Sequence, residues 1–161
     1  MLIEEISVKE LLNECVGIKQ LLAARYGINL EVDIDDANAS ITGYRELLRA
    51  ALNNLIDTSI KHHRGSGRIT IAFHQDAARV SIVVSNNCAG IPYEELCDIQ
   101  DLFCRSGKSF EDEPESMNPN LIGLSIVRDV ADMHGGRVGV RSPEGSGSTF
   151  SMHLPQRRRV A

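Results

Sequence analysis

Two pairs of short segments in this sequence alternate apolar and polar residues, and only a few turn-forming residues separate the members of each pair. Residues 69–73 and 80–84 flank one polar connection, and residues 138–140 and 150–154 flank the turn at 143–147. A period of two indicates strands with one buried face, and a short polar connection joins such strands as an antiparallel hairpin. The sequence therefore predicts two hairpins, and this limits the fold more than any other feature.

Longer segments repeat apolar residues at helical spacing. The first begins at a capping box of Ser7 and Glu10 and stops at Gly27, and two others cover 44–63 and 121–134. The predicted buried stripe of the first helix consists of Val8, Leu11, Leu12, Cys15, Ile18 and Leu22. With a further alternating strand at 28–34, these segments predict an α+β fold. We expect a two-layer sandwich, in which a mixed, mostly antiparallel sheet of about five strands is covered on one face by about three helices.

The stretch from 92 to 120 breaks these patterns. Residues 93–103 predict a short helix, whereas residues 106–120 contain one glycine, two prolines and four acids, a composition typical of a mobile loop. We interpret 92–120 as a lid and 156–161 as a tail. Because nothing else reads as a linker or a repeat, residues 1–161 are expected to form a single domain.

Charge and composition exclude several classes of function. A formal net charge of −5 argues against a nucleic-acid partner, and the basic run at 157–159 is interpreted as a solvated tail. No apolar stretch approaches the roughly 20 residues needed to cross a bilayer, and the first residues do not resemble a secretion signal. The cysteines form no Cys-x-x-Cys pair and are interpreted as buried, reduced thiols; they are Cys15, Cys88, Cys97 and Cys104. We expect a cytoplasmic domain without membrane contact.

One polar stripe lies on the helix predicted at 44–63. Asn54, Thr58 and Lys61 follow one another at i, i+4 and i+7, beside His62, so an amide, a hydroxyl and a cation share one helix face. Taken alone, such a stripe is more typical of a solvated helix edge than of a binding site.

A second polar group follows the strand at 80–84, where Asn86 and Asn87 lead into Gly90 and Pro92. Strand ends of this kind often present side chains to a cleft. By itself, however, one glycine after a strand indicates only a turn.

The motifs are more specific when they are taken together, in their order along the chain. They read Asn54-Leu55-Ile56-Asp57-Thr58-Ser59-Ile60-Lys61-His62, Asn86-Asn87-Cys88-Ala89-Gly90-Ile91-Pro92, Leu102-Phe103, Gly123-Leu124-Ser125-Ile126-Val127 and His134-Gly135-Gly136. This set resembles the ATP-binding domain of sensor histidine kinases, within the wider Bergerat-type family shared with gyrase, the Hsp90 chaperone and MutL. The resemblance covers almost the whole chain and includes the closing Gly-rich turn at 145–150.

The resemblance implies ATP with Mg²⁺ as the cofactor and assigns positions around it. Asn54 and Thr58 correspond to the metal site, Lys61 to a phosphate contact and Asn86 to the adenine contact. The further nucleotide-binding positions are His62, Gly90, Gly123 and Leu124. No residue is assigned to catalysis, because the His-containing acceptor motif of such kinases does not occur in the sequence.

Four of the implied binding positions depart from the family pattern. Thr58 replaces an asparagine, Asn86 an aspartate and Cys88 a glycine, and the lid glycines are replaced at 119–122. An amide acceptor lacks the charge assistance of a carboxylate, and glycines allow backbone N–H groups to approach phosphates. If each change costs about 1 kcal/mol, nucleotide affinity falls by two to three orders of magnitude. The sequence therefore predicts weak or absent ATP binding.

Three functional hypotheses follow. The first is a degenerate kinase domain with a regulatory or docking role, working with the phosphoacceptor and dimerisation helices of a full-length protein and with a response-regulator receiver or phosphotransfer partner. The second is an active kinase domain in which Thr58 and Asn86 are tolerated. The third is a stand-alone, anti-sigma-like regulator of the same fold.

Overall fold

The computed structural model describes residues 2–63, 65–87, 90–104, 121–143 and 146–156. In chain order the elements are β1 (Glu4–Ser7), α1 (Val8–Arg25), β2 (Ile28–Ile34), β3 (Ser40–Gly43), α2 (Arg45–His62), β4 (Gly67–Gln75), β5 (Arg79–Asn86), α3 (Tyr93–Cys104), α4 (Ile122–Met133), β6 (Arg137–Arg141) and β7 (Ser148–Pro155).

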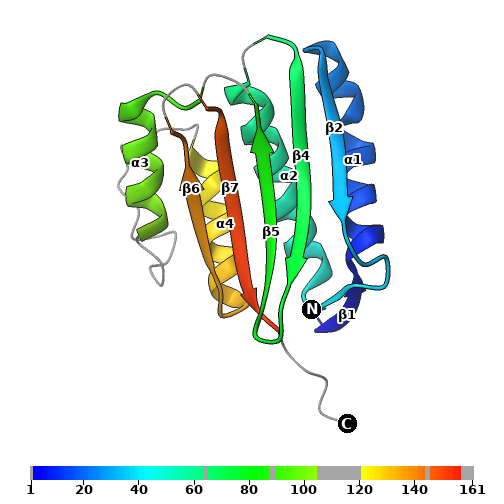
Figure 1. The fold of residues 1–161 in the computed structure, drawn as a ribbon. Helices are drawn as coiled ribbons and strands as arrows, with labels where there is room; N and C mark the ends of the chain where they lie inside the picture. Colours follow the sequence, from blue (N-terminus) through cyan, green and yellow to red (C-terminus); the bar gives the residue numbers. More distant parts are fainter. Residues whose placement is uncertain (1, 64, 88–89, 105–120, 144–145, 157–161) are drawn as a thin grey trace.

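The main sheet has five strands in the order β2-β4-β5-β7-β6 (Figure 1). The β2–β4 pair is parallel, and the other neighbouring pairs are antiparallel. Helices α1, α2 and α4 lie behind this sheet in Figure 1, while α3 lies beside its β6 edge. The predicted α+β sandwich and both predicted hairpins are confirmed.

The β4–β5 hairpin is held by one side chain in its turn. Asp76 Oδ1 accepts hydrogen bonds from the N–H groups of Ala78 and Arg79, both at 2.8 Å, and the Asp76 N–H donates to the Arg79 carbonyl at 2.9 Å. The two backbone donors are the main cause that lowers the pKa of the Asp76 carboxyl. An Asx turn therefore stabilises the connection that the sequence indicated only by its polarity.

The predicted face of α1 was wrong at two positions. Ser7 does cap the helix, with the Glu10 N–H donating to its Oγ at 3.4 Å, but Ile18 is 54% exposed and Leu22 36% exposed. The buried side continues from Cys15 to Ala23 instead. Each residue adds about 100° around a helix axis, so a shift by one position turns the predicted residues towards solvent.

A small second sheet of β1 and β3 was not predicted. Its two strands have four residues each and pair antiparallel, with Ile6 opposite Ile41. The Val8 N–H donates to the Ala39 carbonyl at 3.0 Å, which ties this sheet to the start of α1. Strands this short contain too few residues to show a period of two.

Of the predicted lid, residues 93–104 form α3, which confirms the short helix, whereas residues 105–120 lie outside the described residues. Among the helices in the described ranges, none is long and apolar enough to span a membrane.

The interpretation of the cysteines as buried is correct only for Cys15. Cys97 is half-buried and Cys104 is exposed on α3, while Cys88 lies outside the described residues. Cys104 is the last residue of α3, the helix that lies beside the β6 edge of the sheet.

Alkylation of the native protein at pH 7 is therefore expected to modify Cys104 well before Cys15. Burial raises the pKa of the Cys15 thiol to about 11, and the thiolate is the reactive form. Mass spectrometry of peptides after a time course with iodoacetamide measures both rates, and the same reaction in urea is the control in which Cys15 reacts. Equal rates in the native protein would contradict this placement.

Candidate functional site

The polar residues predicted as ligands gather at one end of the molecule. The C-terminal end of α2, the end of β5, the start of β7 and the start of α3 all lie at the upper end of the sheet in Figure 1. The candidate site is therefore built from segments that are far apart in the sequence.

Asn54 and Thr58 both bond to the backbone of their own helix. Asn54 Nδ2 donates to the Ala50 carbonyl at 2.9 Å, and Thr58 Oγ1 donates to the Asn54 carbonyl at 2.8 Å. Thr58 is only 7% exposed, so this stripe is not a solvated helix edge at that point, whereas Lys61 is exposed. A hydroxyl that bonds the carbonyl at i−4 is held close to the helix.

Helix α4 approaches Asn54 at a glycine. A Cβ atom at Gly123 would lie 2.9 Å from Asn54 Oδ1, so a side chain at position 123 would displace the Asn54 amide. Leu124 is fully buried, so only its backbone could face a ligand. The α4 N-terminus has no side-chain cap, and uncapped N–H groups at a helix start favour anions.

His62 connects α2 to α3. Its Nδ1 lies 2.9 Å from the Thr58 carbonyl, and its Nε2 lies 2.7 Å from Glu95 Oε1. Because a carbonyl oxygen only accepts, His62 Nδ1 must donate to the Thr58 carbonyl. At the other contact, one proton lies between His62 Nε2 and the Glu95 carboxyl group. His62 therefore positions the first turn of α3. Nothing in the sequence singles out Glu95 beyond its being an acid in the first turn of a predicted helix.

Asn86 forms a two-point pair with Ser148, its direct neighbour across β5 and β7. The Ser148 N–H donates to Asn86 Oδ1 at 3.1 Å, and since a backbone N–H cannot accept, this bond fixes the orientation of the amide. Asn86 Nδ2 therefore donates to Ser148 Oγ, at 2.6 Å. Both residues are buried. Sequence reasoning found Asn86 and missed Ser148.

The turn after β5 is fastened to the end of β6. Gly90 has a φ of +91°, and a Cβ atom there would lie 2.8 Å from Ser142 Oγ. Ser142 Oγ accepts from the Ile91 N–H at 2.7 Å and donates to the Gly147 carbonyl at 3.0 Å. The retained glycine is thus required by both its backbone conformation and its neighbour. The predicted contacts of Cys88 and of the changed lid positions 119 and 120 lie outside the described residues.

Residues 43–158 match the family described as "Histidine kinase-, DNA gyrase B-, and HSP90-like ATPase". The chain belongs to this family. Within it, the chain corresponds to the ATP-binding domain of sensor histidine kinases, as the relatives and the solved structures agree.

Two curated relatives are informative. The sensor protein DivL of Caulobacter vibrioides is 29% identical over 154 residues, which are 96% of this chain and 19% of DivL. The adaptive-response sensory kinase SasA of Synechococcus elongatus is 36% identical over 109 residues, which are 67% of this chain and 27% of SasA. The chain therefore spans about a fifth to a quarter of these relatives.

Among solved structures, the catalytic domain of histidine kinase ThkA has a TM-score of 0.79 at 23% identity and covers 97% of both chains. The mycobacterial sensor histidine kinase MprB has a TM-score of 0.72 at 22% identity, covering 98% of this chain and 100% of that one. These likenesses show the shared fold.

The kinase-like site does not fit a magnesium ion held by the protein alone. Proteins usually bind Mg²⁺ through one or two carboxylates together with substrate phosphates. Asn54 and Thr58 offer only neutral oxygens, while the carboxylates nearby in the sequence and the fold are engaged elsewhere: Asp57 pairs with Lys19 at 2.9 Å, and Glu95 with His62. No step of a mechanism is therefore assigned to a metal here.

Proposed function

We propose that this chain is the nucleotide-binding domain of a sensor histidine kinase in which ATP binding is weak, and that the domain acts in regulation or docking. The observation that carries the proposal is the Asn86–Ser148 pair. At the position where members of the family contact adenine with a carboxylate, this chain has the neutral amide of Asn86. The amide oxygen already accepts a hydrogen bond from the Ser148 N–H. Charge-assisted hydrogen bonds are roughly twice as strong as neutral ones, so the adenine contact loses strength.

Thr58 supports the same conclusion. Its hydroxyl is shorter than the amide it replaces, it is nearly buried, and it donates to its own helix. Two features favour nucleotide binding. The start of α4 has no side-chain cap, and Gly123 brings the α4 backbone close to Asn54, so a phosphate group could bind there. These features keep an active kinase domain as the second candidate.

The partners follow from the family. We propose phosphoacceptor and dimerisation helices on the same full-length protein, and a response-regulator receiver or phosphotransfer protein. In support, a solved complex of histidine kinase ThkA with the response regulator protein TrrA contains a chain of the same fold, with a TM-score of 0.74 over 96% of this chain and 42% of that chain, at 22% identity.

Calorimetric titration with ATP and with ADP, each with and without Mg²⁺, tests the proposal. We expect no detectable heat at micromolar nucleotide and a dissociation constant in the millimolar range or weaker. Mg²⁺ is expected to change this value little, because the site supplies no carboxylate for it. Micromolar binding would overturn the proposal and favour the active kinase domain.

A further inference from the structure

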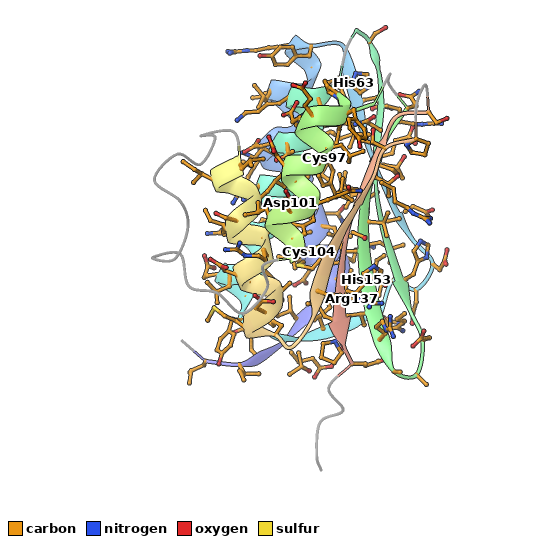
Figure 2. The ribbon with its side chains drawn as sticks, turned by 90° about the vertical axis from the view of Figure 1, so that its left-hand side faces the viewer. His63, Cys97, Asp101, Cys104, Arg137 and His153 are labelled. Carbon is orange, nitrogen blue, oxygen red and sulfur yellow. The ribbon has the colours of Figure 1, made fainter. Side chains whose placement is uncertain are left out.

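Basic side chains gather on the uncovered face of the sheet, at the end opposite the nucleotide site. His153 on β7 lies directly between Ser81 on β5 and Arg137 on β6. Arg79 precedes Ser81 by two residues and therefore points to the same face. The intervening residues, Val80, Ile82, Met152 and Leu154, are buried under the helices. Figure 2 shows Arg137 and His153 together at the lower end of the sheet.

These positive groups lack a carboxylate partner in the part of the chain that the structure describes. No ion pair is formed there by Arg79 or Arg137, and His153 Nδ1 lies 2.8 Å from Ser81 Oγ. The pKa of His153 is lowered first by burial and then by the charges of Arg137 and Arg79. The charge of Arg79 helps to lower the pKa of Asp76, after the two backbone N–H groups that donate to its carboxylate. Two arginines with one nearby carboxylate leave the local charge positive, in a chain of net charge −5.

The same residues border a hollow. Its volume is about 340 Å³, and its lining includes Arg79, Gly135, Gly136, Arg137, His153 and Pro155. Gly135 and Gly136, which form the turn after α4, contribute backbone to this lining. The hollow is open to solvent, and the only charged or titratable side chains that the structure places in its lining are Arg79, Arg137 and His153, all of them basic.

We propose that this hollow, which we name the β-face anion site, binds a phosphate group between Arg79 and Arg137, with His153 as a third donor. Guanidinium groups recognise phosphate through paired N–H donors, and a protonated imidazole adds another charge-assisted bond. The phosphate is either free inorganic phosphate or a phosphomonoester carried by another molecule. The site is separate from the nucleotide end of the domain and does not depend on the proposed function.

The test is an NMR titration of the His153 imidazole against pH, with the resonance assigned by loss in His153→Gln. Spectra in inorganic phosphate are compared with spectra in chloride at equal ionic strength. A bound anion stabilises the imidazolium, so phosphate is expected to raise the pKa of His153. An identical titration curve in the two salts would overturn the proposal.

Variants and a second ligand sharpen the test. Arg79→Gln and Arg137→Gln are each expected to weaken phosphate affinity at least fivefold, whereas the matched control Arg68→Gln, an exposed arginine of β4 paired with Glu31, should leave it unchanged. Equal losses in all three variants would show only general charge and would refute the site. O-phosphoserine separates the sources: binding equal to that of inorganic phosphate indicates a phosphomonoester site, and binding of inorganic phosphate alone indicates a site for the free anion.

Discussion

Thr58→Asn combined with Asn86→Asp is expected to strengthen ATP binding by about ten- to a hundredfold. Each substitution should recover about 1 kcal/mol, and a charged acceptor at position 86 should recover somewhat more. Calorimetric titration of the double variant and of each single variant measures the gain, and the single variants show how it divides between the phosphate and the adenine side.

The structure explains why Asn86→Asp fits. Ser148 can donate to a carboxylate from both its N–H and its hydroxyl, so the new charge at this buried position receives two hydrogen bonds. In the present pair the direction of one bond is reversed, because Asn86 Nδ2 donates to Ser148 Oγ. The change therefore supplies a charged acceptor for which both Ser148 groups can serve as donors.

Asn13→Asp is the matched control, since it adds the same charge at an exposed position of α1. It should not change nucleotide affinity. If the double variant binds ATP no better than the unchanged chain, the proposal that Thr58 and Asn86 weaken nucleotide binding is refuted.

The sequence predicted those parts of the fold that repeat locally. The strands at β4, β5, β6 and β7 show a clear period of two, and the helix starting at Ser7 has a cap that is visible within four residues. The pairing of β1 with β3 was missed because it joins residues about 35 positions apart without a repeating pattern. Local patterns identify elements, but they do not identify a partner for a four-residue strand.

The site shows the same division. His62 and Asn86 were singled out because they fall in ordered motifs, whereas the side chains that they contact come from distant positions. Glu95 is 33 residues from His62, and Ser148 is 62 residues from Asn86. Such partners depend on how distant segments pack in the fold, and neither segment's own sequence predicts that packing.

His134 illustrates a motif residue whose role is structural. Its Nδ1 donates to the Val130 carbonyl at 2.7 Å, and its Nε2 accepts from the Tyr44 N–H at 3.0 Å, so both nitrogens are satisfied in a neutral ring. A Cβ atom at Gly43 would lie 2.6 Å from Nε2. The ring thereby joins the end of α4 to the start of α2, two of the helices that contribute to the candidate site.

Gly136→Ala is expected to lower the free energy of unfolding by about 3 kcal/mol, because its methyl group has no space. Gly135 and Gly136 end α4 in a Schellman motif: the Gly136 N–H donates to the Ala131 carbonyl at 2.8 Å, and the Gly135 N–H to the Asp132 carbonyl at 3.0 Å. A Cβ atom at Gly136 would collide with the backbone carbonyl of His153 on β7. Since that atom belongs to a paired strand, it cannot move without disturbing the sheet.

Two other glycines separate this collision from the general effect of a methyl group. Gly135→Ala meets only Pro155 Cγ at 3.7 Å but has a φ of +73°, so it should cost about 1–2 kcal/mol through backbone strain. Gly17→Ala has open space on an exposed helix face and should stabilise the domain by about 0.5–1 kcal/mol. Urea denaturation of the three variants gives the order Gly17→Ala, Gly135→Ala, Gly136→Ala from most to least stable. If Gly136→Ala were as stable as Gly135→Ala, the close contact of the α4 terminus with β7 would be refuted. The same result would contradict the packing around Gly136, which lines the β-face anion site.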